Sequence, residues 1–257
     1  MRKATAAAWC AVAALLCAGC GISVVISTPT LPPLDCEREG LFRVEATTVW
    51  RFRGDSAFFF ESGMTITAFG APDAFHPEDD ERARDWLANA GAPANWRAFA
   101  TDANGKLVVQ GLGDPMPGFY ISKTGLQDES RAETDPRRYV NADIVPYIVL
   151  PYSQHGDAEL GDFAVVMNRR NGRLTYAIFA DPGPPRYAGE GSIALARSLG
   201  INDNARWGGA DGGILYIVFP GSGNGKPRSL AEIEAEGAKF FEAWGGMRRV
   251  DTCLDRK

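Results

Sequence analysis

The sequence predicts an α+β fold, in which one β-rich domain has an antiparallel sheet or barrel-like core and a few short flanking helices. The chain of 257 residues contains 29 Gly and 16 Pro, which supply many turns between short elements. Several short segments rich in β-branched and aromatic residues lie between these turns. Hydrophobic residues make up 45% of the chain and aromatic residues 11%, which is enough for one sizeable core.

The predicted strands are recognised by β-branched and aromatic content and by the turn residues that separate them. Two Asn-Gly pairs indicate hairpins, and Asn171-Gly172 is typical of a type I′ turn because this turn requires positive φ angles. The predicted strands are 41–52 and 57–69 around Gly54-Asp55, 96–101 and 106–110 around Asn104-Gly105, 142–150, 163–170 and 173–180 around Asn171-Gly172, and 214–220.

Three segments are predicted to be helical from their capping signals. Residues 77–90 begin with acidic side chains and end before Gly91, and residues 192–199 end before Gly200. Residues 229–244 open with a capping box formed by Ser229 and Glu232. In this last helix four large apolar residues fall on one face, which should pack on the sheet: Ile233, Phe240, Phe241 and Trp244.

The first residues are predicted to form an export signal. Residues 1–26 combine a basic start with a long apolar run, and residues 27–36 form a Pro-rich tether. The sequence before Cys20 is similar to a bacterial lipobox, which makes Cys20 a candidate for lipidation. A cleaved signal and an uncleaved membrane anchor are the alternatives. We expect the protein to be secreted, periplasmic or membrane-tethered, with membrane association through the N-terminus only.

Residues 37–257 are predicted to form the folded domain. Only Cys36 and Cys253 lie outside the leader, one near each end of this domain. In an oxidising compartment this arrangement predicts one disulfide that joins the two ends.

Charge and composition argue against several functions. A formal net charge of -5 does not suit binding to a nucleic-acid backbone. The chain has only two histidines, His76 and His155, which argues against a histidine-based zinc site. Residues 221–226 are Gly-rich, but Pro220 and Pro227 depart from the pattern of a phosphate loop, so a turn is predicted there.

Two carboxylates stand out by their position. Asp181 follows a predicted strand, and Glu190 precedes the predicted helix 192–199, with a Pro-rich segment between them. A connection of this length can bring the two carboxyl groups to opposite sides of one cleft. Two such groups are the minimum equipment for hydrolysis of a glycosidic bond, because one protonates the leaving oxygen and the other activates water or attacks carbon.

The chain resembles glycoside hydrolase family 75, the chitosanase family, in its bacterial branch. The resemblance runs from about Phe75 to Ser222 and rests on several short blocks in a fixed order. These blocks are 90–96 (AGAPANW), 118–122 (GFYIS), 145–151 (VPYIVLP), 161–166 (GDFAVV), 181–196 and 216–222 (YIVFPGS).

The resemblance implies endo-hydrolysis of β-1,4-linked glucosamine polymers with inversion, without a metal or an organic cofactor. The two essential carboxylates of the family match Asp181 and Glu190. The positive end of the following helix favours an ionised Glu190 and thus a role as base, but burial can reverse this small effect, so the two roles remain open. Chitosan or a related amino-sugar polymer is the expected partner, and the sequence does not predict the oligomeric state.

Five further residues are candidates for substrate binding. Acidic side chains attract the ammonium groups of such a polymer, and aromatic rings can stack on sugars. The candidates are Asp143, Asp162, Asp211, Tyr120 and Tyr147.

One departure from the family favours a different function. The family usually has an acidic Asp-x-Asp-Gly element before its first helix, whereas this chain has Thr67-Ala68-Phe69-Gly70. Loss of both acids is compatible with reduced activity. The alternatives are a non-catalytic glycan-binding lipoprotein of the cell envelope, and hydrolysis of another amino-sugar polymer such as peptidoglycan.

Overall fold

The computed structural model describes residues 33–92 and 95–255, and the chain from Leu34 onward forms one compact unit. The predicted leader, Cys20 and residues 27–32 of the predicted tether lie outside the described residues. The strands are β1 (Arg38–Val44), β2 (Thr47–Phe52), β3 (Phe58–Thr67), β4 (Gly91–Ala92), β5 (Asn95–Trp96), β6 (Tyr147–Pro151), β7 (Phe163–Asn168), β8 (Arg173–Gly183), β9 (Glu190–Ser192) and β10 (Ala210–Phe219). The helices are α1 (Ile193–Ser198), α2 (Leu230–Trp244) and α3 (Gly246–Arg249), with 3₁₀ turns at Leu87–Ala90 and Pro136–Arg138 and a π turn at Val250–Leu254.

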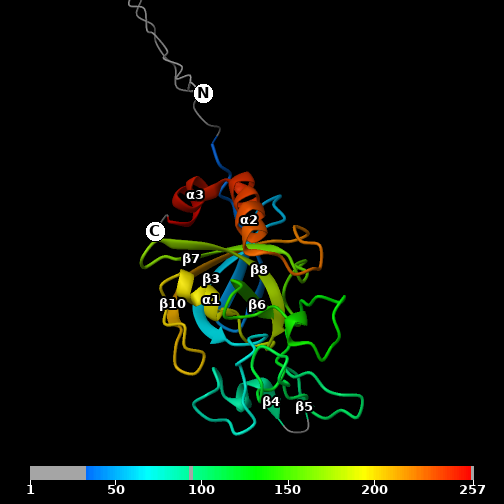
Figure 1. Ribbon diagram of the computed structural model, residues 1–257. Coiled ribbons are helices and arrows are strands. Elements are labelled where there is room, and N and C mark those ends of the chain that lie inside the picture. Colours follow the sequence, from blue (N-terminus) through cyan, green and yellow to red (C-terminus); the bar gives the residue numbers. More distant parts are fainter. Residues whose placement is uncertain (1–32, 93–94, 256–257) are drawn as a thin grey trace, which may run out of the picture. The chain divides into compact units, whose positions relative to one another are not determined.

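The main sheet closes on itself. Its strand order is β1-β2-β3-β10-β7-β8-β6-β9, and β9 also pairs with β3. Strands β3, β10, β7, β8, β6 and β9 therefore form a closed barrel, to which the β1–β2 hairpin is added at one edge (Figure 1). Most neighbours are antiparallel, but β6–β8 and β3–β9 are parallel. The predicted β-rich α+β domain with a barrel-like core and few helices is confirmed.

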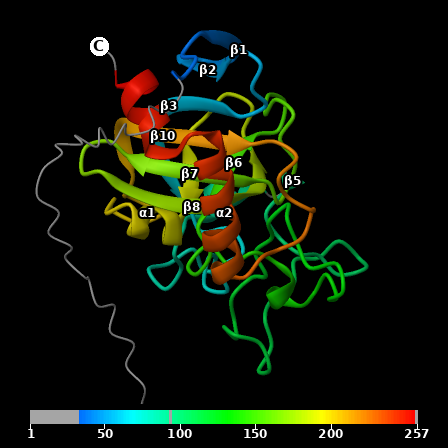
Figure 2. The same ribbon diagram turned by 90° about the horizontal axis from the view of Figure 1, so that it is seen from above.

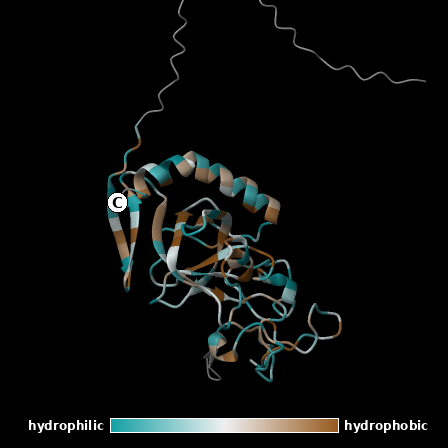
Figure 3. Ribbon diagram, turned by 90° about the vertical axis from the view of Figure 1, so that its left-hand side faces the viewer, coloured by the Kyte–Doolittle hydropathy of each residue, from teal (hydrophilic) through white to brown (hydrophobic). Residues whose placement is uncertain are grey.

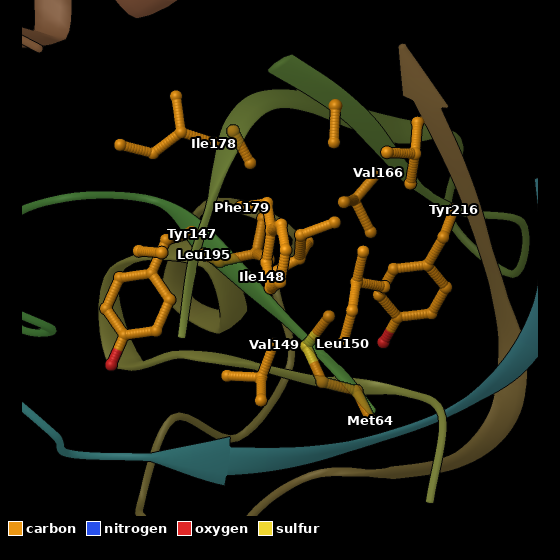
Figure 4. Close-up of a cluster of buried hydrophobic side chains, with 14 of the residues drawn as sticks. Met64, Tyr147, Ile148, Val149, Leu150, Val166, Ile178, Phe179, Leu195 and Tyr216 are labelled. Atoms are coloured by element: carbon orange, nitrogen blue, oxygen red, sulfur yellow. The ribbon is translucent and has the colours of Figure 1, made fainter. Parts of the chain in front are cut away.

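The barrel interior is filled by large apolar side chains. Ile148 and Leu150 of β6 point toward Phe179 and Tyr216, whereas Val149 points in another direction (Figure 4). This alternation follows from the two-residue period of a strand. All of β6 is nevertheless buried, and on its other face the Tyr147 hydroxyl donates to the Phe69 carbonyl in the segment between β3 and β6. A strand buried on both faces reads as a continuous apolar run, as residues 147–151 do.

Helix α2 lies across β7 and β8 (Figures 1 and 2). It begins at the predicted capping box, in which the Ser229 side chain accepts from the Glu232 backbone and Glu232 accepts from the Ser229 backbone. Hydrophobic and hydrophilic residues alternate along it (Figure 3), and Phe241 and Trp244 are buried. Phe240 stacks on Phe163 of β7 at a ring-centroid distance of 5.6 Å. The predicted helix and its packing on the sheet are confirmed.

The two ends of the described domain are joined. Cys36 and Cys253 form the predicted disulfide, with their Cα atoms 5.1 Å apart. Arg249 of α3 pairs with Asp55 at 2.7 Å and adds a second connection between the C-terminal segment and the β2–β3 turn. None of the helices in the described part of the chain has both the length and the apolar composition needed to span a bilayer.

The prediction of a single strand at 41–52 is wrong. This segment is a hairpin in which β1 and β2 pair antiparallel, from Val44 opposite Thr47 to Arg38 opposite Phe52. The turn contains Glu45 at a positive φ of 48°, which the sequence does not signal with Gly or Asn. The predicted pairing across Gly54-Asp55 is present as β2–β3.

The predicted helix at 77–90 is also wrong, because only the 3₁₀ turn at 87–90 forms. Asp79 adopts a positive φ of 49°, and its Oδ1 accepts from the Leu87 backbone N–H at 2.7 Å. Asp80 accepts in the same way from Arg82. Short acidic side chains compete for backbone donors in this manner, and here they stabilise a folded loop instead of a helix.

The other predicted elements are found with shifted bounds. Of 142–150 only Tyr147–Leu150 are in a strand, β6, which extends to Pro151, and residues 96–110 form isolated bridges around a turn at Gly105 instead of a regular hairpin. The β7–β8 hairpin is confirmed, but its pairing closes at Asn168 opposite Arg173, and in its turn only Gly172 has positive φ. The turn is therefore not type I′, which needs two such residues.

Candidate active site

A cavity of about 920 Å³ lies between the barrel and the long segment that connects β3 to β6. One wall comes from barrel strands, with Thr65 and Thr67 of β3, Asp181 of β8 and Glu190 of β9. The other wall comes from the connecting segment, with Asp85, Asn89, Ala90, Gly91, Arg97, Ala98, Lys123, Thr124, Gly125 and Gln127. The cavity thus contains both carboxylates that the sequence singles out.

Asp181 and Glu190 are neighbours of the same residue. Val149 of β6 is the register partner of Asp181 on β8 and also of Glu190 on β9. Directly opposite residues in a sheet project from the same face, and adjacent strands lie about 4.8 Å apart. The two Cα atoms are therefore separated by roughly 9.6 Å across two strand spacings. The register therefore places both side chains on one face of the barrel wall, with the strand of Val149 between them.

Ser192 fixes the strand that carries Glu190. Its hydroxyl donates to the Val145 carbonyl at 2.8 Å and accepts from the backbone N–H groups of Tyr147 and Leu195. One buried side chain therefore caps α1 and attaches β9 to β6. The prediction of a helix just after Glu190 is confirmed, with Ser192 as its N-cap.

Asp181 is almost enclosed, with 8% of its surface exposed. Its Oδ1 accepts from the backbone N–H of Gly125, on the opposite wall, at 2.6 Å. Burial raises the pKa of Asp181 to about 8; the Gly125 N–H opposes this shift, and the negative charge of Glu190 adds to it. A carboxyl group with this pKa is mostly protonated at neutral pH.

Glu190 is partly exposed at the cavity wall. Burial raises its pKa to about 7, hydrogen bonding by the Thr67 side chain lowers it, and the nearby charge of Asp85 raises it. The pKa of Glu190 is therefore raised less than that of Asp181. The two carboxyl groups share one cavity, and Glu190 is the more ionised of the two at neutral pH.

Asp85 is a third carboxylate in this cavity, and sequence reasoning missed it. It is 2% exposed, and its Oδ1 accepts from the Trp86 backbone and from the Asn89 side chain at 2.8 and 2.6 Å. Burial raises its pKa to about 6, and the charge of Arg206 opposes this. The predicted helix at 77–90 gave Asp85 no distinct signal, because an acid in a helix is usually solvated.

The departure from the acidic family element lies in the same cavity. Thr67 and Phe69, which stand in place of the two acids, both line it, and Thr67 contacts Glu190. Three cations also line the cavity: Arg97, Lys123 and Arg206. The charge of the site thus depends on Asp85 as well as on Asp181 and Glu190.

Gly183 on β8 leaves space for the side chains of Val149 and Glu190 on the neighbouring strands. A Cβ atom at this position would lie 2.5 Å from Cγ1 of Val149 and 3.4 Å from Oε2 of Glu190. Gly125 is similarly restricted, because its Cβ would lie 2.6 Å from Cδ of Pro182. Both glycines therefore provide space beside the carboxylates.

The other predicted binding residues do not join this cavity. Asp143 pairs with Arg197 and Arg84, and Tyr120 packs on Phe99 with ring centroids 5.1 Å apart. Tyr147 is fully buried, with its hydroxyl donating to the Phe69 carbonyl at 2.9 Å. Asp211 lines a neighbouring hollow. None of these residues, nor Asp162, is among the described residues that line the cavity.

Asp162 stabilises a turn of its own chain. Its carboxylate accepts from the backbone N–H groups of Gly223, Gly221 and Glu159 at 2.7, 3.1 and 2.8 Å. The Gly-rich segment 221–226 thus binds a carboxylate of its own chain. The predicted turn is confirmed there.

One group of possible metal ligands lies elsewhere. Ligand atoms of His76, Glu78 and Asp80 lie within 4.8 Å of one another. Arg82 pairs with both carboxylates of this group. The group is an ion-pair network in the loop that replaces the predicted helix, and none of its three members lines the cavity.

Comparison with known proteins agrees with the geometry. The sequence pattern of the family described as fungal chitosanase of glycosyl hydrolase group 75 matches residues 120–246. No curated protein sequence matches the chain significantly. The matched region begins later than the resemblance noted from residue 75 and extends through α2. It includes both Asp181 and Glu190. Residues 120–246 therefore match glycoside hydrolase family 75, within the compact unit that begins at Leu34.

Proposed function

We propose that this protein is an exported, endo-acting chitosanase that uses Asp181 and Glu190 to cleave β-1,4 glucosamine linkages with inversion. The observation that carries the proposal is the shared register partner of the two carboxylates. Val149 separates them by two strand spacings on one face of the barrel, at the wall of a cavity. Both residues lie within the region that matches the family.

The electrostatics of the cavity support one assignment of roles. Asp181, which is enclosed and has a pKa of about 8, supplies the proton to the leaving glycosidic oxygen. Glu190, with a pKa of about 7, is the better candidate for the ionised base that removes a proton from water. The water attacks the anomeric carbon from the opposite side while the bond to the leaving oxygen breaks, so the configuration inverts.

Two carboxylates of the cavity offer partners for the ammonium groups of an amino sugar, although three cations line the cavity as well. Asp85 and Glu190 have lower pKa values than Asp181, and partial burial strengthens the attraction of their ionised forms for an ammonium group. Asp85 keeps a negative charge near Glu190 although the two family acids at positions 67 and 69 are absent. We infer that Asp85 compensates in part for this loss.

Export is the second part of the proposal. The disulfide between Cys36 and Cys253 is compatible with an oxidising compartment. The basic, then apolar, N-terminal sequence and the Pro-rich tether support the same interpretation.

A second candidate function is glycan binding without cleavage. It is favoured by Thr67 and Phe69, which place a hydroxyl and an aromatic ring in the cavity where the family usually has acids. Under this alternative the cavity binds an amino-sugar polymer, and the two carboxylates only attract its ammonium groups.

The test is hydrolysis of chitosan by the purified protein, with sizing of the products and detection of their anomeric form. Asp181→Asn and Glu190→Gln should each lower the rate by at least a hundredfold while the far-ultraviolet spectrum and Tm show a folded protein. Asp157→Asn and Glu129→Gln are matched controls because both residues are exposed. Retention of chitosan without any product would favour the binding function, and unchanged rates in both variants would exclude the proposed mechanism.

A further inference from the structure

A second hollow, of about 840 Å³, adjoins the catalytic cavity. The two share three lining residues, Thr65, Tyr187 and Gly208. The second hollow continues along β3 to Ser62 and is bordered on the far side by the β7–β8 turn. The shared residues make the two spaces neighbours on the surface of the barrel.

The loop before β10 separates the two spaces. Ala205 and Arg206 line the catalytic cavity, Trp207 and Gly209 line the second hollow, and Gly208 lines both. Consecutive residues of this loop therefore line different spaces, and the loop forms the boundary between the catalytic cavity and the second hollow. A ligand that extends from the catalytic cavity across this loop would contact Trp207 on the other side.

Trp207 is held in place although it is exposed. Its indole is 74% exposed, and its ring packs edge-on against Trp86 with centroids 5.5 Å apart. Oδ1 of Asn204 accepts from the backbone N–H groups of Arg206 and Trp207, at 2.9 and 3.0 Å. Arg206 lies over the other aromatic ring, 3.8 Å from the centroid of Trp86. When a ligand covers an exposed apolar side chain, the removal of apolar surface from water favours binding. Because Trp207 is already held in place, little conformational entropy is lost on binding.

The remaining lining is polar. Asp211 is exposed near the start of β10, just after the loop that carries Trp207, and Arg170 is the cation on the opposite border. An indole face attracts both the C–H face of a sugar and an ammonium group, and a carboxylate attracts the ammonium as well. These features fit successive units of a glucosamine polymer better than those of a neutral or anionic glycan.

We propose that this second hollow binds the part of the polymer that extends beyond the cleavage point, with Trp207 as the stacking residue and Asp211 as the partner of an ammonium group. The proposal rests on the proposed function and names the path of its substrate. It also assigns Asp211 a place in substrate binding outside the catalytic cavity.

The test compares long and short substrates. In Trp207→Ala, kcat/KM for a long glucosamine polymer should fall about fivefold more than kcat/KM for the shortest oligomer that is cleaved, which corresponds to about 1 kcal/mol. Trp207→Phe should restore part of the difference, because an aromatic face remains. Leu112→Ala is the control, since Leu112 is 98% exposed and lines neither space. Equal losses on long and short substrates would overturn the proposal.

A binding experiment separates this proposal from the catalytic one. In the Glu190→Gln background, retention of glucosamine polymer should weaken about fivefold when Trp207→Ala is added, and retention of fully N-acetylated polymer should change less. Asp211→Asn should show the same preference. If the wild type cleaves nothing but these differences remain, the proposed activity fails and the polymer-binding surface stands. If Trp207→Ala binds the polymer as strongly as its parent, the second hollow does not bind the polymer through Trp207, whether or not the protein is active.

Discussion

Asp181 and Glu190 flank Val149, one on each neighbouring strand, at the same level of the barrel wall. The spacing between them is therefore set by backbone hydrogen bonding on both sides of β6, and not by the loop that joins them. The exception in that loop is Gly189, whose positive φ of 114° and close approach to the Gly63 carbonyl help to seat β9 beside β3. The spacing of these two carboxylates is thus a property of the barrel.

This relationship predicts that Gly183→Ala damages catalysis. The new methyl group would lie 2.5 Å from Cγ1 of Val149, which is buried, so β6 and β8 must shift relative to each other beside Glu190. We expect kcat to fall about tenfold to a hundredfold, because displacements of about 1 Å have such effects. Steady-state kinetics on chitosan measure this change.

The double variant Gly183→Ala/Val149→Ala tests whether the clash with Val149 causes the loss of activity. Removal of the Val149 methyl groups creates space for the added one and should restore part of kcat. Gly113→Ala is the matched control, because a Cβ there meets no atom within 4 Å. A double variant no better than Gly183→Ala would show that the contact with Val149 is not the cause.

The pH dependence of kcat/KM should be bell-shaped, with its maximum between about pH 7 and about pH 8. Glu190, with a pKa of about 7, must be ionised, which sets the acidic limb, and Asp181, with a pKa of about 8, must be protonated, which sets the alkaline limb. Initial rates on a soluble glucosamine oligomer between pH 4 and pH 10 measure both limbs.

Asp85→Asn should move the acidic limb to lower pH. The charge of Asp85 raises the pKa of Glu190, so its removal makes Glu190 easier to ionise, while Thr67 and Asp181 still face it. Titration of the substrate amines affects both pH profiles equally, because wild type and variant are compared on the same oligomer. An acidic limb at an unchanged pH would mean that Asp85 does not act through Glu190.

Local signals predicted much of the fold. The capping box of α2, the Gly200 that follows α1 and the apolar runs of β7, β8 and β10 are each contained within a few consecutive residues. Barrel closure was not visible, because it depends on β9, a strand of three residues that pairs with Thr65 far away in the sequence. The resemblance identified Asp181 and Glu190, but it did not reveal Val149 as their common partner.

Competition between local interactions explains the main errors. Acidic residues at 78–81 match the start of a helix, yet Asp79 and Asp80 bind backbone N–H groups of a loop. Asp85 was missed for the same reason, since its burial depends on this loop. Asp162 was predicted to bind substrate from its acidic character alone, and three backbone N–H groups that the sequence did not signal donate to its carboxylate.

Removal of the disulfide should destabilise the domain. Cys36 and Cys253 are separated by 217 residues, and cross-linking a loop of this length stabilises by about 5 kcal/mol on the chain-entropy estimate. The double variant Cys36→Ser/Cys253→Ser should therefore unfold at a lower denaturant concentration than the wild type. A reducing agent should lower the stability of the wild type and leave that of the double variant unchanged; equal stability of both proteins would contradict the prediction.

The stability of the wild type should decrease as the pH rises from about 4 to about 8, because folding raises the pKa of Asp181. The folded state keeps a proton on this carboxyl that the unfolded state releases, so the contribution is fully present below the ordinary pKa of about 4 and is lost as the pH rises through about 8. Asp181→Asn removes the titrating group and should be more stable than the wild type at pH 8, by a margin that shrinks toward pH 5. Tm measured by calorimetry in steps of pH shows this trend, and Asp157→Asn, an exposed control, should show no comparable trend. A difference in Tm between Asp181→Asn and the wild type that stays constant with pH would mean that Asp181 is ionised in the folded protein, and it would then not be available as the acid.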